Sequence, residues 1–345
     1  MSKTSATIQQ IHAATIEELQ NRLGDSPLEF LENLQRPTWI TLPGSDMSRS
    51  RAVVTLLHAN EPSGLRALHH LLKRNIQPAT NLGILVASVE AALYPPAFSH
   101  RYLPNEKDLN RCFGNPSSSN QSLLANHILE ILRDFQPEAV VDTHNTSGHS
   151  DVFAVAANSS LATHQVCQLF THKLVEINQS MGTLIEQKLG CPIVTVEFGG
   201  FLDPNSDRSA ISSIEQFVTR SQIFNTEPEH VKVLPNPLRL EVTKQCNLQY
   251  ASTVEGSAHL TMFNTIDQLN FRSLASGTAL GWLEESHFDK LKVLNRNQQN
   301  IADELFQDIN GVLSTRIPMT IFMATTDPNI ASDDCLLYLC PEVNL

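Results

Sequence analysis

Residues Arg51-Ala-Val-Val-Thr-Leu-Leu-His58-Ala-Asn-Glu61 give the first indication of the architecture of this 345-residue chain. Their apolar part, residues 51–57, predicts a buried strand, and a histidine and a glutamate follow where it ends. Residues 64–73 then predict a helix with its leucines on one side, and residues 82–89 predict a second strand. A strand, a polar turn, a helix and a strand in this order indicate an α/β fold.

The same alternation of strands and helices continues to about residue 200. We expect a helix over residues 122–135, strands at 139–143 and 152–156, a helix over 161–180 and a strand at 193–196. Continuous apolar strands that alternate with helices are typical of a sheet that helices cover on both faces. The sequence therefore predicts an α/β sheet between two helical layers.

The pattern of apolar residues divides the chain into three parts. Residues 1–45 predict an N-terminal helical extension, because residues 6–23 show helical apolar spacing. Residues 46–230 hold the strands and helices of the main α/β domain. Short runs in which apolar and polar residues alternate then predict a smaller β-rich C-terminal domain over residues 231–345, with a helix near residues 300–312.

The composition excludes several classes of partner. Acidic residues outnumber basic ones by 36 to 24, and the net charge of -12 argues against general binding of nucleic acid or anionic membranes. An anionic substrate would therefore need locally concentrated Arg or Lys. The six cysteines show no CxxC pairing, and the chain has neither a hydrophobic signal core nor an apolar run of about 20 residues. We expect a cytoplasmic protein with reduced thiols.

Three side chains predict a metal site. His58 and Glu61 follow one apolar run, and a second run, residues 139–142, leads to His144 in the same way. Ligands of α/β sheets bind at the carboxyl ends of the strands. Two imidazoles and one carboxylate form the ligand set of a catalytic zinc site, which leaves one coordination position open. We expect one Zn²⁺ per chain, although this set also suits other divalent ions, and His149 is an alternative to His144.

Two further carboxylates stand close to these residues in the sequence. Asp142 is two residues before His144 on the same strand face, so it could accept a hydrogen bond from a ligand imidazole. A solvated strand-end carboxylate or a helix cap explains Asp142 equally well. Glu197 ends a third strand just before Gly199-Gly200, where a substrate could approach closely. We expect Glu197 to transfer protons, with an ordinary strand-end glutamate as the alternative.

The loop from His100 to Arg111 is rich in basic side chains. Its arginines could present a planar fork to a substrate carboxylate, and Asn110 beside Arg111 would add a directional donor. Solvated loop charges are the simpler explanation from composition alone.

These motifs together resemble those of the succinylglutamate desuccinylase/aspartoacylase family, a branch of the zinc carboxypeptidase superfamily. The resemblance covers roughly residues 50–205, and the order of the motifs is the same. They are His58-Ala-Asn-Glu61, Arg101-Tyr102, Asp108-Leu-Asn-Arg-Cys-Phe113, Asp142-Thr-His144 and Val196-Glu197.

The resemblance implies a role for each motif. His58, Glu61 and His144 would bind zinc, Glu197 would be the general acid and base, and Arg101 would polarise the scissile carbonyl. The implied fold is zinc carboxypeptidase-like, with a mixed central sheet in the catalytic domain of residues 46–230.

The remaining implied roles concern the substrate. Asn110 and Arg111 would hold a substrate carboxylate. Gln187 and Lys188 stand where family members have an arginine for a second acidic group, and Lys188 would supply a point charge there.

The leading hypothesis is therefore a zinc-dependent amidohydrolase that removes the acyl group from an N-acyl amino acid. A carboxypeptidase-like metallopeptidase and a non-catalytic metal-binding protein are the alternatives. The expected partner is a small anionic N-acyl amino acid, without nucleic acid or membrane, and a homo-oligomer is compatible with the sequence.

Overall fold

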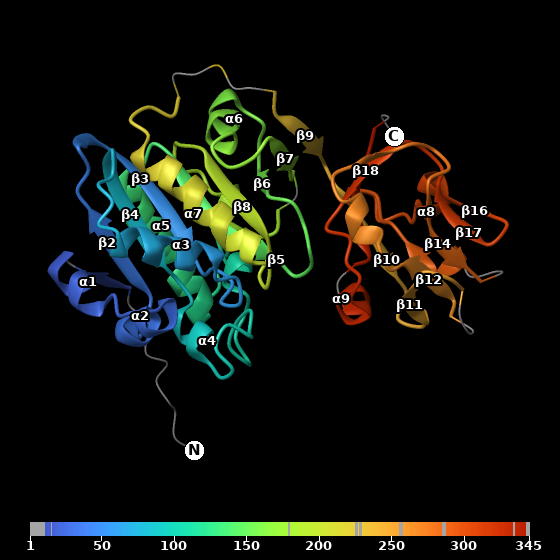
Figure 1. Cartoon of the computed structure of the whole chain (residues 1–345), viewed down its shortest axis with the longest axis horizontal. Coiled ribbons are helices and arrows are strands. Elements are labelled where there is room, and N and C mark those ends of the chain that lie inside the picture. The colour runs from blue at the N-terminus through green and yellow to red at the C-terminus, as the bar shows by residue number, and fades with distance from the viewer. Residues whose placement is uncertain are drawn as a thin grey trace. The chain divides into compact units, whose positions relative to one another are not determined.

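The computed structural model describes residues 11–14, 16–178, 180–224, 227, 230–254, 258–284, 288–333 and 335–342. The chain forms two compact units (Figure 1). The first, here called the α/β unit, comprises Met1–Asn145 and Val152–Val233. The second, here called the β unit, comprises Leu234–Leu345 together with the short segment Thr146–Asp151.

The sheet of the α/β unit runs in the order β1-β2-β4-β3-β5-β8-β6-β7-β9 across the described residues. β3 is parallel to β4 and β5, whereas β2 is antiparallel to β4 and β6 is antiparallel to β8. The mixed central sheet predicted from the sequence is thereby confirmed. Its strands are β1 (His12–Ala14), β2 (Thr38–Leu42), β3 (Asp46–Thr55), β4 (Thr80–Val86), β5 (Val140–Thr146), β6 (Phe153–Ala156), β7 (Lys173–Glu176), β8 (Ile193–Gly200) and β9 (Lys232–Pro235).

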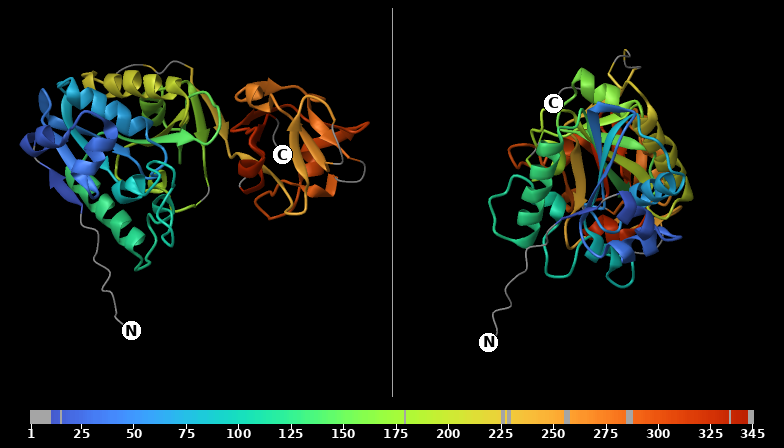
Figure 2. Two further views of the ribbon diagram at one scale, coloured as in Figure 1. Left: turned by 60° about the horizontal axis from the view of Figure 1, so that its bottom comes forward. Right: turned by 90° about the vertical axis from the view of Figure 1, so that its left-hand side faces the viewer.

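Helices cover both faces of this sheet (Figure 2). Ile84 and Val86 of β4 lie in one apolar cluster with residues of α3 (Ser63–Lys73) and α7 (Pro204–Thr219), which pack against each other. Gly83 faces the opposite side, where an added Cβ would lie 2.8 Å from the ring of Phe135 in α5 (Asn120–Phe135). Alternate residues of one strand thus contact opposite helical layers, as the pleat requires. Helices on both faces are confirmed.

A buried arginine in the middle of β3 links this strand to α7. Arg51 Nε donates to Glu138 Oε1 over 2.6 Å, and Nη1 donates to the carbonyls of Phe217 and Arg220 at the end of α7. The last carbonyls of a helix have no partner within the helix. Arg51 therefore ties α7 to the strand that leads toward His58.

The remaining helices of the α/β unit differ in part from expectation. α1 (Ile16–Arg22) falls within the predicted helix 6–23, but His12–Ala14 forms β1, and residues 6–10 lie outside the described residues. The helix predicted over residues 161–180 is wrong beyond its first turns. α6 (Leu161–Cys167) ends early, and β7 follows because the consecutive apolar residues Leu174 and Val175 are both buried in the sheet. Two further short helices of this unit are α2 (Pro27–Leu34) and α4 (Val89–Leu93), which pack against each other.

Among its described residues, the β unit contains two five-stranded sheets with an apolar core. The predicted helix at residues 300–312 is wrong: only α8 (Ala302–Leu305) is helical, and a hairpin turns at Asn310-Gly311, both with positive φ. Asn-Gly is a strong hairpin-turn signal. The strands are β10 (Leu238–Val242), β11 (Leu248–Ala251), β12 (Leu260–Phe263), β13 (Ser273–Leu274), β14 (Ala279–Leu283), β15 (Leu291–Lys292), β16 (Phe306–Ile309), β17 (Val312–Thr315), β18 (Met319–Phe322) and β19 (Leu337–Pro341), and α9 spans Pro328–Asp333.

No helix in the described part of the chain is both long enough and apolar enough to cross a membrane.

Candidate active site and metal centre

His58 and Glu61 lie in the turn between β3 and α3. The chain leaves β3 after Thr55 through Leu56, whose φ is 58°, and the amide of Glu61 donates to the carbonyl of His58 over 3.2 Å. This tight turn brings the two side chains together, and His58 Nδ1 lies 3.0 Å from Glu61 Oε1. Both residues are buried.

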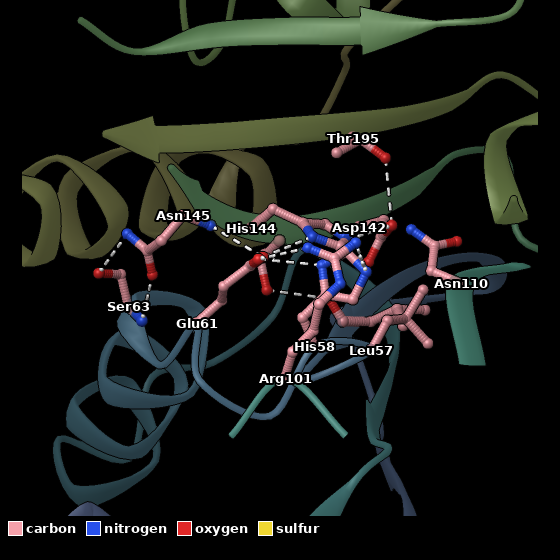
Figure 3. A network of polar contacts seen from close by, with 12 residues as sticks. Leu57, His58, Glu61, Ser63, Arg101, Asn110, Asp142, His144, Asn145 and Thr195 are labelled. Carbon is pink, nitrogen blue, oxygen red and sulfur yellow. Dashed lines mark hydrogen bonds and ion pairs between the residues drawn. The ribbon is translucent and has the colours of Figure 1, made fainter. Parts of the chain in front are cut away.

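His144 comes to the same place from the neighbouring strand β5. Its Nδ1 lies 2.6 Å from Glu61 Oε2, so Glu61 bridges the two imidazoles, whose centroids are 4.5 Å apart (Figure 3). One ligand atom from each of the three residues lies within 4.8 Å of the others. Zinc binds nitrogen and oxygen at about 2.0–2.2 Å, so atoms this close can share one ion. The group His58, Glu61 and His144 could hold a metal ion.

A carboxylate backs each imidazole on the side away from Glu61. Asp142 Oδ2 lies 2.8 Å from His144 Nε2, and Asp108 Oδ1 lies 3.3 Å from His58 Nε2. A carboxylate on the free nitrogen is the usual arrangement around metal-binding histidines, where it fixes the ring and raises its basicity. Asp142 is fully buried, so it is not a solvated strand-end residue.

The mutual interactions of these groups displace their pKa values. Burial alone would lower the pKa of His144, but the carboxylates of Asp142 and Glu61 raise it well above its usual range. Burial alone would raise the pKa of Glu61, but His58 and His144 hold it well below its usual range. Without a metal, these shifts favour an ionised Glu61 and a protonated His144, so a metal that binds here must displace the proton of His144.

Glu197 lies in β8 on the face that also carries Thr195. Thr195 Oγ1 donates to Asp142 Oδ2 over 3.1 Å, and residues two apart on a strand share a face. Glu197 Oε2 is buried and has no hydrogen-bond partner among the described residues. Burial raises the pKa of Glu197 to about 7, and Glu61 adds to the rise, while His144, His58 and Arg101 oppose it. A carboxyl with a pKa near neutrality can both accept and donate a proton.

Arg101 reaches His58 and Glu61 from the loop before Asp108. Its Nε donates to Asp108 Oδ2 over 2.9 Å, its Nη1 lies 3.6 Å from Glu61 Oε1, and its Nη2 lies 2.6 Å from His58 Nε2. The side chain is 39% exposed, so its guanidinium is accessible beside the buried cluster.

The residues expected to bind the substrate differ from one another in burial and in their contacts. Asn110 is buried beside the cluster (Figure 3), and its Oδ1 accepts from the amide of Leu184 over 3.0 Å. Arg111 is exposed, and its Nη1 donates to the carbonyl of Asn110. Lys188 is exposed and makes no hydrogen bond or ion pair within the described residues, so no contact links it to the cluster. His149, the alternative ligand, is not a member of the group.

The contacts of two polar residues of the site, Asp108 and Asn145, were not predicted from the sequence. Asp108 belongs to the Asp-Leu-Asn-Arg motif, and its Oδ1 accepts from the amide of Asn110, but its place on His58 depends on the fold. Asn145 follows His144 and bonds to Ser63. No local pattern could have revealed either contact, because the partners are far apart in the sequence.

Comparisons with known proteins identify the family of this chain and structures that share its fold. Residues 49–220 match the family model described as the succinylglutamate desuccinylase/aspartoacylase catalytic domain, which confirms the resemblance seen in the motifs. A comparison with curated protein sequences finds no match.

Several solved structures share the fold at low sequence identity. The succinylglutamate desuccinylase/aspartoacylase from Rhodobacter sphaeroides is 14% identical, with 88% of each chain covered and a TM-score of 0.58. The succinylglutamate desuccinylase from Vibrio parahaemolyticus is 13% identical, covering 92% of this chain and 95% of that one, with a TM-score of 0.54. The product-bound ectoine utilization protein EutE (DoeB) from Ruegeria pomeroyi is 17% identical, covering 82% and 81%, with a TM-score of 0.50. These likenesses concern the fold alone.

Proposed function

The chain belongs to the succinylglutamate desuccinylase/aspartoacylase family, and from this membership we propose that it is a zinc-dependent amidohydrolase that deacylates an N-acyl amino acid. The observation that carries the proposal is the carboxylate of Glu61 between two imidazoles, together with Glu197 in β8, whose buried Oε2 has no hydrogen-bond partner among the described residues. A metal-binding group beside a carboxyl with a near-neutral pKa suits hydrolysis better than metal storage.

The donor set fits zinc. His58, Glu61 and His144 would hold the ion, since two imidazoles and a carboxylate form a three-ligand catalytic set. When bound, zinc would supply a Lewis acid that polarises a carbonyl and lowers the pKa of water. Asp108 and Asp142 would keep the ligand rings oriented.

The protein's own residues would move the protons and stabilise the developing charge. Glu197 would take a proton from the attacking water and return it to the amine nitrogen as the amide bond breaks. Arg101 would donate to the carbonyl oxygen as negative charge develops on it. The proximity of its partly exposed guanidinium to Glu61 and His58 supports this role.

The substrate would be a small anionic N-acyl amino acid. Asn110 and Arg111 would hold its carboxylate: the backbone N–H of Leu184 donates to the Asn110 side chain and fixes it, and Arg111 is exposed, with its Nη1 on the carbonyl of Asn110. Lys188 would give a point charge for a second acidic group. In a chain with a net charge of -12, such local cations are needed to attract an anion.

We further propose that residues 46–230 are the catalytic domain, flanked by the extension 1–45 and the β-rich domain 231–345. The cysteines in the described structure are free thiols. Free thiols suit the cytoplasm, which we propose as the location of the protein.

A substrate panel tests the proposal. Protein purified without chelator is assayed for zinc and for release of amine from N-acyl amino acids and from short peptides. We expect about one zinc per chain and turnover of N-acyl amino acids. Turnover of peptides alone would indicate a carboxypeptidase-like enzyme, and absence of zinc with no binding on addition would refute the hydrolase.

A further inference from the structure

Asn145 is a buried amide that the proposed reaction does not use. Its Oδ1 accepts from the amide of Ser63 over 3.0 Å, and its Nδ2 donates to Ser63 Oγ over 3.0 Å and to the carbonyl of Gly199 over 2.9 Å. Its own backbone N–H donates to Glu61 Oε2 over 3.2 Å (Figure 3). All of these contacts lie within the α/β unit.

These hydrogen bonds join the three segments that carry the proposed site. Ser63 is the first residue of α3 and follows Glu61 by two positions. Gly199 follows Glu197 by two positions in β8. Asn145 itself directly follows His144 in β5. One side chain therefore spans the turn with the bridging carboxylate, the strand with the second imidazole and the strand with the proton-transfer group.

The hydroxyl of Ser63 is also hydrogen-bonded to α7. Its Oγ donates to Asp207 Oδ1 in α7 over 2.7 Å, and Asp207 pairs with Arg66 of α3 over 3.0 Å. Asn145 offers one acceptor and two donors at fixed angles, and each finds a partner in the described structure. A buried network whose members are all satisfied is rigid, and rigidity is what a ligand turn needs.

We propose that Asn145 is a positioning residue that fixes Glu61 relative to His144 and thereby sets the affinity of the metal site. This inference rests on the zinc-dependent function proposed above. Ligand groups must be held to within about 0.5 Å for tight binding, and residues that support the ligands supply that precision. Asn145 does so twice, through its N–H on Glu61 Oε2 and through its amide on Ser63.

Zinc affinity tests the role directly. We expect Asn145→Ala to raise the dissociation constant for zinc by about 10–100-fold, measured by competition with a chromophoric chelator. Ser63→Ala should raise the dissociation constant less, because the backbone N–H of residue 63 still donates to Asn145 Oδ1. The double variant should lose less zinc affinity than the two single losses combined, since both changes remove the hydrogen bond between Asn145 Nδ2 and Ser63 Oγ. Visible absorption of the Co²⁺-loaded proteins reports the same loss of geometry.

Asn270 provides a matched control. It is a buried asparagine of the β unit whose amide donates to the carbonyls of His149 and Ala324 and accepts from the amide of Ala324. Asn270→Ala should lower the melting temperature and leave zinc affinity unchanged.

The outcomes separate this inference from the proposed function. If Asn145→Ala and Ser63→Ala bind zinc as the wild type does, while Asn145→Ala melts as early as Asn270→Ala, the amide is only structural and the inference is overturned. If Asn145→Ala does not fold, an unchanged zinc affinity of Ser63→Ala overturns it. A wild-type protein that binds no zinc would instead refute the function on which the inference rests.

Discussion

At the scale of single residues, the site is a set of carboxylates that share two imidazoles. Glu61 contacts both rings on one side, and Asp108 and Asp142 contact one ring each on the other. Their mutual repulsion is offset in part by the guanidinium of Arg101, which lies 2.9 Å from Asp108 Oδ2 and 3.6 Å from Glu61 Oε1. A divalent cation bound by Glu61 and the two imidazoles would offset it further.

The carboxylate of Asp142 should strengthen metal binding through His144. We expect Asp142→Asn, which keeps the size of the side chain but removes its charge, to raise the dissociation constant for zinc by about 10–100-fold. Chelator competition measures the effect. Asp134→Asn, an exposed position on α5, is the control and should bind zinc as the wild type does. Equal zinc affinities of Asp142→Asn and wild type would contradict the role.

The pH dependence of hydrolysis should report Glu197. Burial raises its pKa to about 7, and the group must be ionised to accept a proton. Below that pKa the carboxyl is protonated, so kcat/KM should fall as the pH falls and reach a plateau above it. A profile of kcat/KM from about pH 5 to pH 8 measures this. A flat profile across that range would rule out a base with such a pKa.

At the scale of elements, the close packing of α3 on the sheet depends on Gly64. A Cβ at this position would lie 2.0 Å from Thr143 Oγ1 of β5 and 2.9 Å from Thr55 Oγ1 of β3. A glycine inside a helix costs about 1 kcal/mol relative to alanine, so its presence here reflects the approach of the strand. That approach is what brings the Glu61 turn onto His144.

Gly64→Ala should therefore destabilise the fold, although alanine favours helices. We expect a loss of about 1–3 kcal/mol in the free energy of unfolding, because the methyl group must push the helix away from β5. Urea unfolding measures it, with Ser212→Ala on the exposed side of α7 as a helix-propensity control. A Gly64→Ala protein as stable as wild type would mean that α3 can move without cost.

Sequence patterns predicted the elements whose apolar residues repeat regularly. α3 and α5 lie where leucine spacing placed them, and β3, β5 and β8 follow from continuous apolar runs. The pattern failed at β7, because an apolar run of a few residues suits a helix or a buried strand equally. It could not show that Asp108 meets His58 or that Asn145 meets Ser63, because such contacts depend on how distant segments pack.

At the scale of the whole molecule, the proposed ligands all lie in one unit. His58, Glu61 and His144 belong to the first segment of the α/β unit, Met1–Asn145, while the β unit supplies none of them. The two tryptophans of the chain fall one in each unit, Trp39 in the α/β unit and Trp282 in the β unit. Each can therefore report the unfolding of its own unit.

Zinc should stabilise the α/β unit selectively. An ion at 100 times its dissociation constant adds about 2.7 kcal/mol to the folded state. We expect zinc to raise the melting temperature seen by Trp39 fluorescence in a Trp282→Phe protein, and a chelator to reverse it. The Trp39→Phe protein, read through Trp282, should respond less. A response to zinc through Trp282 alone would place the ion outside the proposed site.

The central claim is that a metal-binding group and a proton-transfer carboxyl act together in hydrolysis. Glu197→Gln tests it most directly, because glutamine keeps the shape of the side chain but cannot accept the proton. Zinc content and turnover of the best N-acyl amino acid are measured on the same preparation. We predict wild-type zinc content with kcat lowered by at least about 10²-fold. A Glu197→Gln protein that keeps its zinc and hydrolyses the substrate at the wild-type rate would contradict the account.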